Sequence, residues 1–207
     1  MLTSMPTNAY QPGPLAPVQR VETPDGWTLV FTRDLRHPVE KVWRALSERG
    51  QLREWAPYLP DRDLTSEGPA VLGMLDADGT EQPMAGSVLR VEPPRLLEHA
   101  FGSDVLRWEL LPTAEGTRLV LRHSFADGAW SSALAAGWHI CLDVADALLA
   151  GAPFGPVVGT KALDYGWNGL NEQYAAVLGV PPARPWESAP ESAPESGPGS
   201  AGQGSAR

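Results

Sequence analysis

Residues 33–55 read RDLRHPVEKVWRALSERGQLREW. A strand over Trp27–Leu35 is expected to end just before Pro38, which suits a first helical turn because its missing N–H would have no partner there. Apolar residues then recur at the i, i+3, i+4, i+7 spacing of one helix face: Val39, Val42, Trp43 and Leu46. This pattern predicts an amphipathic helix over Pro38–Ser47, with a second short helix over Gln51–Trp55.

Further strands are predicted downstream, separated by short turns. They cover Val71–Asp76, Met84–Glu92, Leu96–Phe101, Val105–Leu111 and Arg118–Phe125, and the turns include Asp78–Gly79, Pro93–Pro94, Gly102–Ser103 and Ala114–Gly116. In the last two strands, apolar and polar residues alternate with the period of two that strands have. Consecutive strands with tight turns are typical of an antiparallel meander.

Two helices are predicted near the C-terminal end of the domain. Apolar residues recur with helical period over Ser131–Leu149, and Gly151–Pro153 is expected to end that helix. A further helix is predicted over about Lys161–Leu178, with Gly179 as its end.

Composition narrows the class of protein. The chain has 207 residues, 43% of them hydrophobic, and a net charge of −9, which together predict one domain and argue against a nucleic-acid partner. The sequence shows no apolar run of about 18 residues and no signal peptide, so a cytoplasmic protein without a membrane partner is expected. Cys141 is the single cysteine and is interpreted as a small buried apolar residue.

The two ends of the chain are rich in proline. Residues 1–24 are predicted to form a disordered arm, and residues 181–207 a disordered tail that repeats Glu-Ser-Ala-Pro. The domain itself is expected over residues 25–180.

The segment from Trp27 to Val180 resembles the START-like (SRPBCC) superfamily of helix-grip proteins. Within it, the sequence is most similar to stand-alone bacterial members of the family named after the activator of heat-shock protein 90 ATPase homologue. Four motifs carry the resemblance: the strand–Pro38–Glu40–Val42–Trp43 entry, the pair Leu52 and Trp55, the segment AGWHICL over residues 136–142, and GWNGLNEQY over residues 166–174. The resemblance implies an α+β fold in which a curved antiparallel sheet wraps around a long C-terminal helix, with an additional terminal helix.

A helix laid across a strongly curved sheet leaves a cavity between them, and such cavities are mostly apolar. The strand phases and the resemblance predict a lining of Phe101, Leu106, Trp108, Leu121 and His123 from the sheet and of Trp138, His139 and Leu142 from the long helix, with Trp55 and Tyr58 at the mouth. The alternative is that these residues simply fill a core.

Two histidines, His123 and His139, are candidate functional residues. His123 or His139 could contact a ligand or move a proton, although a core histidine bonded to a neighbour is the commoner case. No metal-ligand motif is present, and no metal or other cofactor is expected. Asp143 and Asp146 are predicted to be solvent-exposed, and Arg33 to pair with surface acids.

Three functions remain open. The first is a binding protein for a small apolar or aromatic ligand, without chemistry of its own. The second is an enzyme similar to polyketide cyclases, with His123 as the candidate catalytic residue. The third is a chaperone-associated protein, as the family name implies. Whether the chain is an enzyme is left open, with binding alone favoured, and either a monomer or a homodimer is compatible with the sequence.

Overall fold

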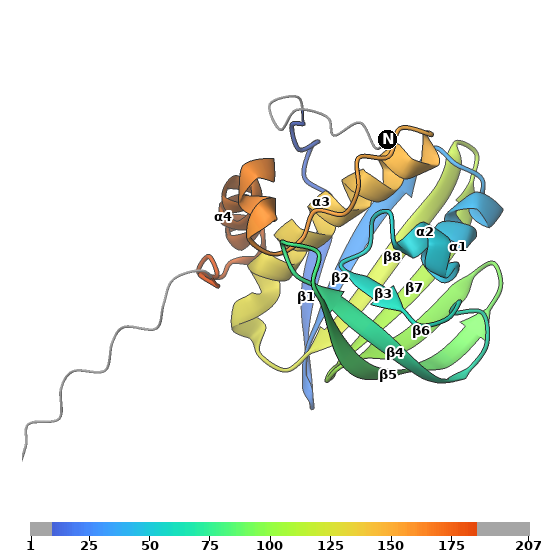
Figure 1. The fold of residues 1–207 in the computed structure, drawn as a ribbon. Coiled ribbons are helices and arrows are strands. Elements are labelled where there is room, and N and C mark those ends of the chain that lie inside the picture. Colours follow the sequence, from blue (N-terminus) through green and yellow to red (C-terminus); the bar gives the residue numbers. More distant parts are fainter. Residues whose placement is uncertain (1–9, 186–207) are drawn as a thin grey trace, which may run out of the picture.

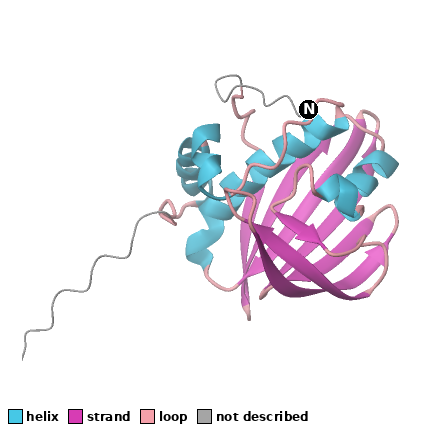
Figure 2. Cartoon of the chain, viewed as in Figure 1, coloured by secondary structure: helices cyan, strands magenta, loops and turns pink. Residues whose placement is uncertain are grey.

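A computed structural model describes residues 10–185 (Figure 1). Its eight strands form one antiparallel sheet in the order β1-β2-β8-β7-β6-β5-β4-β3. The strands are β1 (Val18–Thr23), β2 (Gly26–Leu35), β3 (Tyr58–Pro60), β4 (Gly68–Leu75), β5 (Glu81–Glu92), β6 (Leu96–Phe101), β7 (Asp104–Thr113) and β8 (Gly116–Phe125). The sheet is strongly curved, and its helices lie on the concave side (Figure 2).

The helices cover that concave side from two directions. They are α1 (Val39–Ser47), α2 (Arg49–Leu52), the 3-10 helix η2 (Gly128–Trp130), α3 (Ser131–Leu149), the 3-10 helix η3 (Gly159–Tyr165) and α4 (Trp167–Leu178). The long helix α3 crosses the sheet, α1 and α2 close one end, and α4 lies against α3 (Figure 1). This arrangement is the predicted helix-grip fold.

The predicted faces of the strands are confirmed. On β7, Leu106, Trp108 and Leu110 are buried, and on β8 Leu119, Leu121, His123 and Phe125 are buried. Helix α1 begins at Val39, one residue later than predicted. Pro38 is its N-cap, with an extended ψ of 147°, and its carbonyl accepts the N–H of Val42 at 3.1 Å.

Several boundaries differ from the prediction. The predicted disordered arm is wrong for Val18–Thr23, which pairs with β2 as strand β1 and so extends the domain toward the N-terminus. The predicted helix Gln51–Trp55 is wrong beyond Leu52, where α2 ends. The predicted helix Lys161–Leu178 is broken at Gly166, whose φ of 80° separates η3 from α4. Residues 1–9 and the Glu-Ser-Ala-Pro repeats lie outside the described residues.

By length and composition alone, Gly128–Leu149 could cross a membrane. In this fold the segment is the core helix of a globular domain, because most of α3 is buried, including Ala135, Ile140 and Val144 at 0% exposure.

His99 is a fully buried polar residue and is not among the predicted site residues. Its Nε2 atom lies 3.1 Å from the hydroxyl of Tyr58 and 3.4 Å from the indole Nε1 of Trp108, which can only donate. Nε2 is therefore an acceptor, and the hydrogen sits on Nδ1, which has no hydrogen-bond partner among residues 10–185. Burial lowers the pKa of His99 to about 4.

This histidine predicts a pH dependence of stability. Unfolded histidine has a pKa of about 6.5, so between about pH 6.5 and pH 4 the unfolded chain binds a proton that the folded chain does not. His99 should therefore contribute a stability loss of about 3 kcal/mol as the pH falls through that window. Urea unfolding of the wild type and of His99→Gln, which keeps an acceptor for Tyr58, measures the effect. The difference between the two unfolding free energies should change with pH, and parallel pH profiles would contradict the prediction.

Candidate ligand pocket

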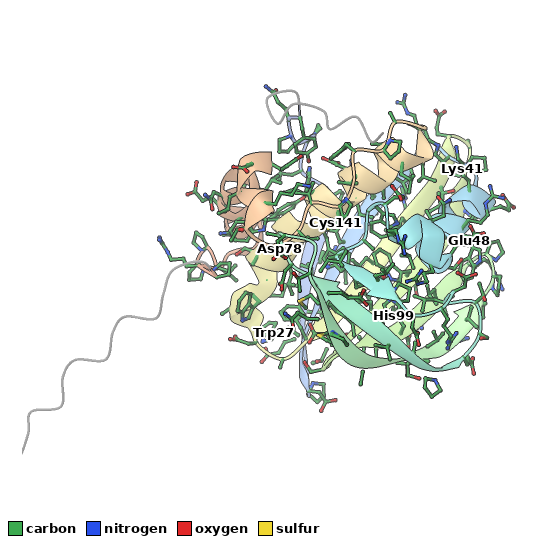
Figure 3. The ribbon with its side chains drawn as sticks, in the orientation of Figure 1. Trp27, Lys41, Glu48, Asp78, His99 and Cys141 are labelled. Atoms are coloured by element: carbon green, nitrogen blue, oxygen red, sulfur yellow. The ribbon has the colours of Figure 1, made fainter. Side chains whose placement is uncertain are left out.

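An apolar pocket of about 370 Å³ opens between α3, the end of β4 and the segment that leads into η3. It is lined by Pro57, Met74, Leu75, Asp76, Phe101, His123, Trp130, Ala133, Leu134, Gly137, Trp138, Cys141, Val157, Val158, Gly159, Ala162, Trp167 and Pro185. Trp130 and Met74, exposed by 47% and 39%, lie at its rim. Figure 3 labels Cys141, which lies on α3 and lines the pocket, and Asp78, which lies in the turn between β4 and β5.

Three of the predicted lining residues are in this pocket: Phe101, His123 and Trp138. The other predicted residues do not line it, and the prediction is wrong for them. Leu106, Trp108, Leu121 and Leu142 are fully buried core residues. Trp55 and Tyr58, predicted at the mouth, are also fully buried; the indole of Trp55 donates to the Ala45 carbonyl at 2.9 Å.

His123 is held by two hydrogen bonds that fix its tautomer. The indole Nε1 of Trp138 donates to His123 Nδ1 at 3.0 Å. The hydrogen of the ring must then be on Nε2, which lies 2.9 Å from the Asp104 carboxylate and donates to it. Both ring nitrogens are thus occupied, and the contact with His123 holds the Trp138 ring against the pocket. The Trp138 ring also packs edge-on against Trp108, with centroids 5.3 Å apart.

His139 lies on the other side of α3, away from the pocket, which corrects the prediction for this residue. Its Nδ1 atom is 2.7 Å from the Tyr174 hydroxyl on α4, and its Nε2 atom is 3.5 Å from Asp143. Burial lowers the pKa of His139, although the negative charge of Asp143 opposes that shift. The residue joins α3 to α4 and does not line the pocket.

Asp143 was predicted to be solvent-exposed, and this prediction is wrong because its side chain is largely buried. Its carboxylate accepts hydrogen bonds from the Arg33 guanidinium and, at 2.7 Å, from the Tyr10 hydroxyl. The Asp143 side chain is only 10% exposed, whereas that of Asp146 is 44% exposed and pairs with His37. The expected surface pairing of Arg33 is therefore a largely buried ion pair that ties β2 and the N-terminal segment to α3.

The pocket also contains residues that sequence reasoning missed. Trp130 ends the short 3-10 helix η2, and Val157–Gly159 lead into the 3-10 helix η3. In segments this short, no hydrophobic period marks a face. Cys141 lines the pocket as a buried thiol, and burial raises its pKa to about 12. Among residues 10–185, no three His, Cys, Asp or Glu side chains gather closely enough to hold a metal ion.

Gly159 closes one side of the pocket against the turn between β4 and β5. Its φ is +57°, and a Cβ atom there would lie 3.0 Å from the backbone nitrogen of Ala77. Gly159→Ala should therefore push the turn away from the η3 segment, at a cost of about 1–2 kcal/mol from the left-handed backbone alone. Faster amide exchange at Asp76 and Gly79, whose N–H groups bond within the turn, would report the movement.

The matched control is Gly155→Ala. Gly155 also has a left-handed φ, of +82°, but a Cβ atom there meets nothing within 4 Å. Both variants should lose the stability that the left-handed backbone costs, and only Gly159→Ala should accelerate exchange in the β4–β5 turn. Equal exchange rates in the two variants would show that Gly159 does not brace the turn.

Residues 36–150 match the family described as Activator of Hsp90 ATPase homolog 1-like protein. No curated protein matches the chain significantly.

Solved structures share the fold. CalU16 from Micromonospora echinospora superposes with a TM-score of 0.57 at 21% identity, over 82% of this chain and 98% of CalU16. The AHSA1 protein from Silicibacter pomeroyi superposes with a TM-score of 0.51 at 22% identity, over 59% of this chain and 97% of that protein. DynU16, a protein in the dynemicin biosynthetic locus, superposes with a TM-score of 0.53 at 22% identity, over 62% of this chain and 49% of DynU16. At these identities, the likeness is one of fold.

Proposed function

The chain belongs to the Activator of Hsp90 ATPase homolog 1-like family, and we propose that this member binds a small, largely apolar ligand in the pocket beneath α3. The observation that carries the proposal is the pocket itself, about 370 Å³ in volume and lined mainly by apolar and aromatic side chains. Ligand sites are typically concave, apolar and about 300–1,000 Å³ in volume. Phe101, Trp130, Trp138 and Trp167 supply flat aromatic surface, which favours a ligand with aromatic rings.

The state of His123 supports binding without acid–base chemistry. A general base needs a free nitrogen within reach of the proton that it removes. Both nitrogens of His123 already bond to Trp138 and Asp104, so the residue is better suited to fixing the position of Trp138. We propose that the His123–Trp138 pair forms a rigid wall of the site.

A direct test uses N-phenyl-1-naphthylamine, a neutral apolar probe that becomes fluorescent in apolar surroundings. Saturable binding of one probe per chain, with quenching of tryptophan emission, is the expected result. Native mass spectrometry of the purified protein should in addition reveal any small molecule that stays bound. No saturable binding of the probe, together with an empty protein in the mass spectrum, would overturn the proposal.

The other two functions stay predictions from the resemblance. A cyclase requires that His123→Ala abolish turnover of a substrate while its binding survives. A chaperone-associated role requires a measurable effect of the chain on the ATPase rate of purified Hsp90.

A further inference from the structure

We propose that this pocket selects neutral or cationic aromatic ligands over anionic ones, and that Asp76 is the residue that imposes the selection. The inference rests on the proposed function, because it concerns the ligand of the same pocket. Its basis is the distribution of charge around an otherwise apolar wall.

The charged side chains that line the pocket are all of one sign. Among the described lining residues none is lysine or arginine, and Asp76 is the one whose side chain is a carboxylate. An anionic group that is carried into such a pocket would lose its water without gaining a cationic partner, which is costly. An apolar or aromatic group meets no such penalty there.

Two basic side chains, Lys161 and Arg184, belong to segments next to the pocket but lie outside its wall. The Lys161 amine donates to the Pro156 carbonyl at 3.0 Å, and Lys161 is not part of the pocket wall. Arg184 lines a neighbouring hollow beside Asn168 and Glu172, not this pocket. His123 offers no free donor, because its Nε2–H group is directed to Asp104. Among residues 10–185, the wall of the pocket therefore presents no positive group that would compensate an anion.

Asp76 places a negative charge at the opening of the pocket. It follows the end of β4 and is exposed, so its charge faces both solvent and the pocket mouth. The Gln82 amide donates to its Oδ2 atom at 3.3 Å, but this donor is neutral and leaves the negative charge in place. Repulsion at the mouth acts in the same direction as the net charge of −9 on the whole chain. A ligand with a hydroxyl or ammonium group could instead donate to this carboxylate.

Two probes with one skeleton test the selection. N-phenyl-1-naphthylamine is neutral, and 8-anilino-1-naphthalenesulfonate is the same molecule with a sulfonate added. Fluorescence titration of the full-length protein at low salt should give a dissociation constant at least about tenfold lower for the neutral probe, which corresponds to about 1.4 kcal/mol. Asp76→Lys should narrow that ratio at least about fivefold, mainly by tighter binding of the sulfonate.

The matched control is Glu115→Lys, which changes the net charge by the same amount. Glu115 is exposed in the turn between β7 and β8 and does not line the pocket. The Glu115→Lys variant should keep the ratio of the two dissociation constants within about twofold of the wild-type value. Asp76→Asn, which keeps the size of the side chain, should shift the ratio in the same direction as Asp76→Lys and serves if the lysine variant does not fold.

The outcomes separate this inference from the proposed function. If neither probe binds, the proposed function fails. If both probes bind equally well to the wild type, ligand binding stands and the charge selection is wrong. If Glu115→Lys narrows the ratio as much as Asp76→Lys does, the net charge selects the ligand, and the assignment to Asp76 is overturned.

Discussion

Gly137→Leu is expected to weaken binding of N-phenyl-1-naphthylamine by more than about tenfold without loss of stability. Gly137 lies on α3 at the pocket wall, and a Cβ atom built on it meets nothing within 4 Å. A leucine side chain would therefore enter the pocket and take the space of the ligand. Because glycine in a helix interior costs roughly 0.5–1 kcal/mol relative to leucine, the free energy of unfolding should stay the same or rise. Probe titration and urea unfolding measure the two effects.

Gly169→Leu is the matched control for this variant. Gly169 is an exposed residue inside α4 and does not line the pocket. The same gain in helix propensity is expected there, with unchanged probe binding. If Gly137→Leu binds the probe as tightly as Gly169→Leu does, the ligand site is not beneath α3.

Asp143→Ala is expected to lower the free energy of unfolding by about 3–5 kcal/mol, because it leaves the Arg33 guanidinium without its partner in a largely buried place. The Arg33 side chain is 18% exposed, and the Asp143 carboxylate also accepts the Tyr10 hydroxyl. Burial and this hydrogen bond together raise the pKa of Tyr10. Urea unfolding at neutral pH measures the loss.

Asp146→Ala provides the comparison on the same helix. Its side chain is 44% exposed and its ion pair with His37 is near the surface, where such pairs contribute about 0–1 kcal/mol. A loss of less than about 1 kcal/mol is expected. Equal losses from the two variants would show that the Arg33–Asp143 pair is not a buried support of the fold.

The contrast between these two aspartates shows which features the sequence could predict. Helical period placed both residues on α3 three positions apart, but it contains no information on what packs against each side of that helix. Asp143 is covered because the N-terminal segment returns with Tyr10, and α4 adds Tyr174 beside His139. Both partners are more than thirty residues away along the chain, so no local pattern could identify them.

Only part of the pocket lining could be predicted from the sequence. Alternation along β7 and β8 correctly predicted which side chains point to the inward face of the sheet. It does not tell which of those side chains are covered by others and which line the pocket. Trp108 points inward and is sealed by Trp55 and Trp138, which pack edge-on at 6.0 and 5.3 Å between ring centroids. Phe101 is the last residue of β6 and His123 lies near the end of β8, and it is at these strand ends that the pocket opens.

The wall of the pocket is assembled from two parts of the chain, one inside and one outside the segment that matches the family. The segment by which the family is recognised, residues 36–150, supplies strands β3 to β8 and α3, whereas β1 and β2 precede it. Val157, Val158, Ala162 and Trp167 lie beyond it and cover the other side of the pocket. Substitutions in this outer part can reshape the space for a ligand without disturbing the sheet or its central helix. Members of one family can thus diverge in what they bind while they keep a common scaffold, and the segment after residue 150 is where an engineer would randomise positions to change ligand preference.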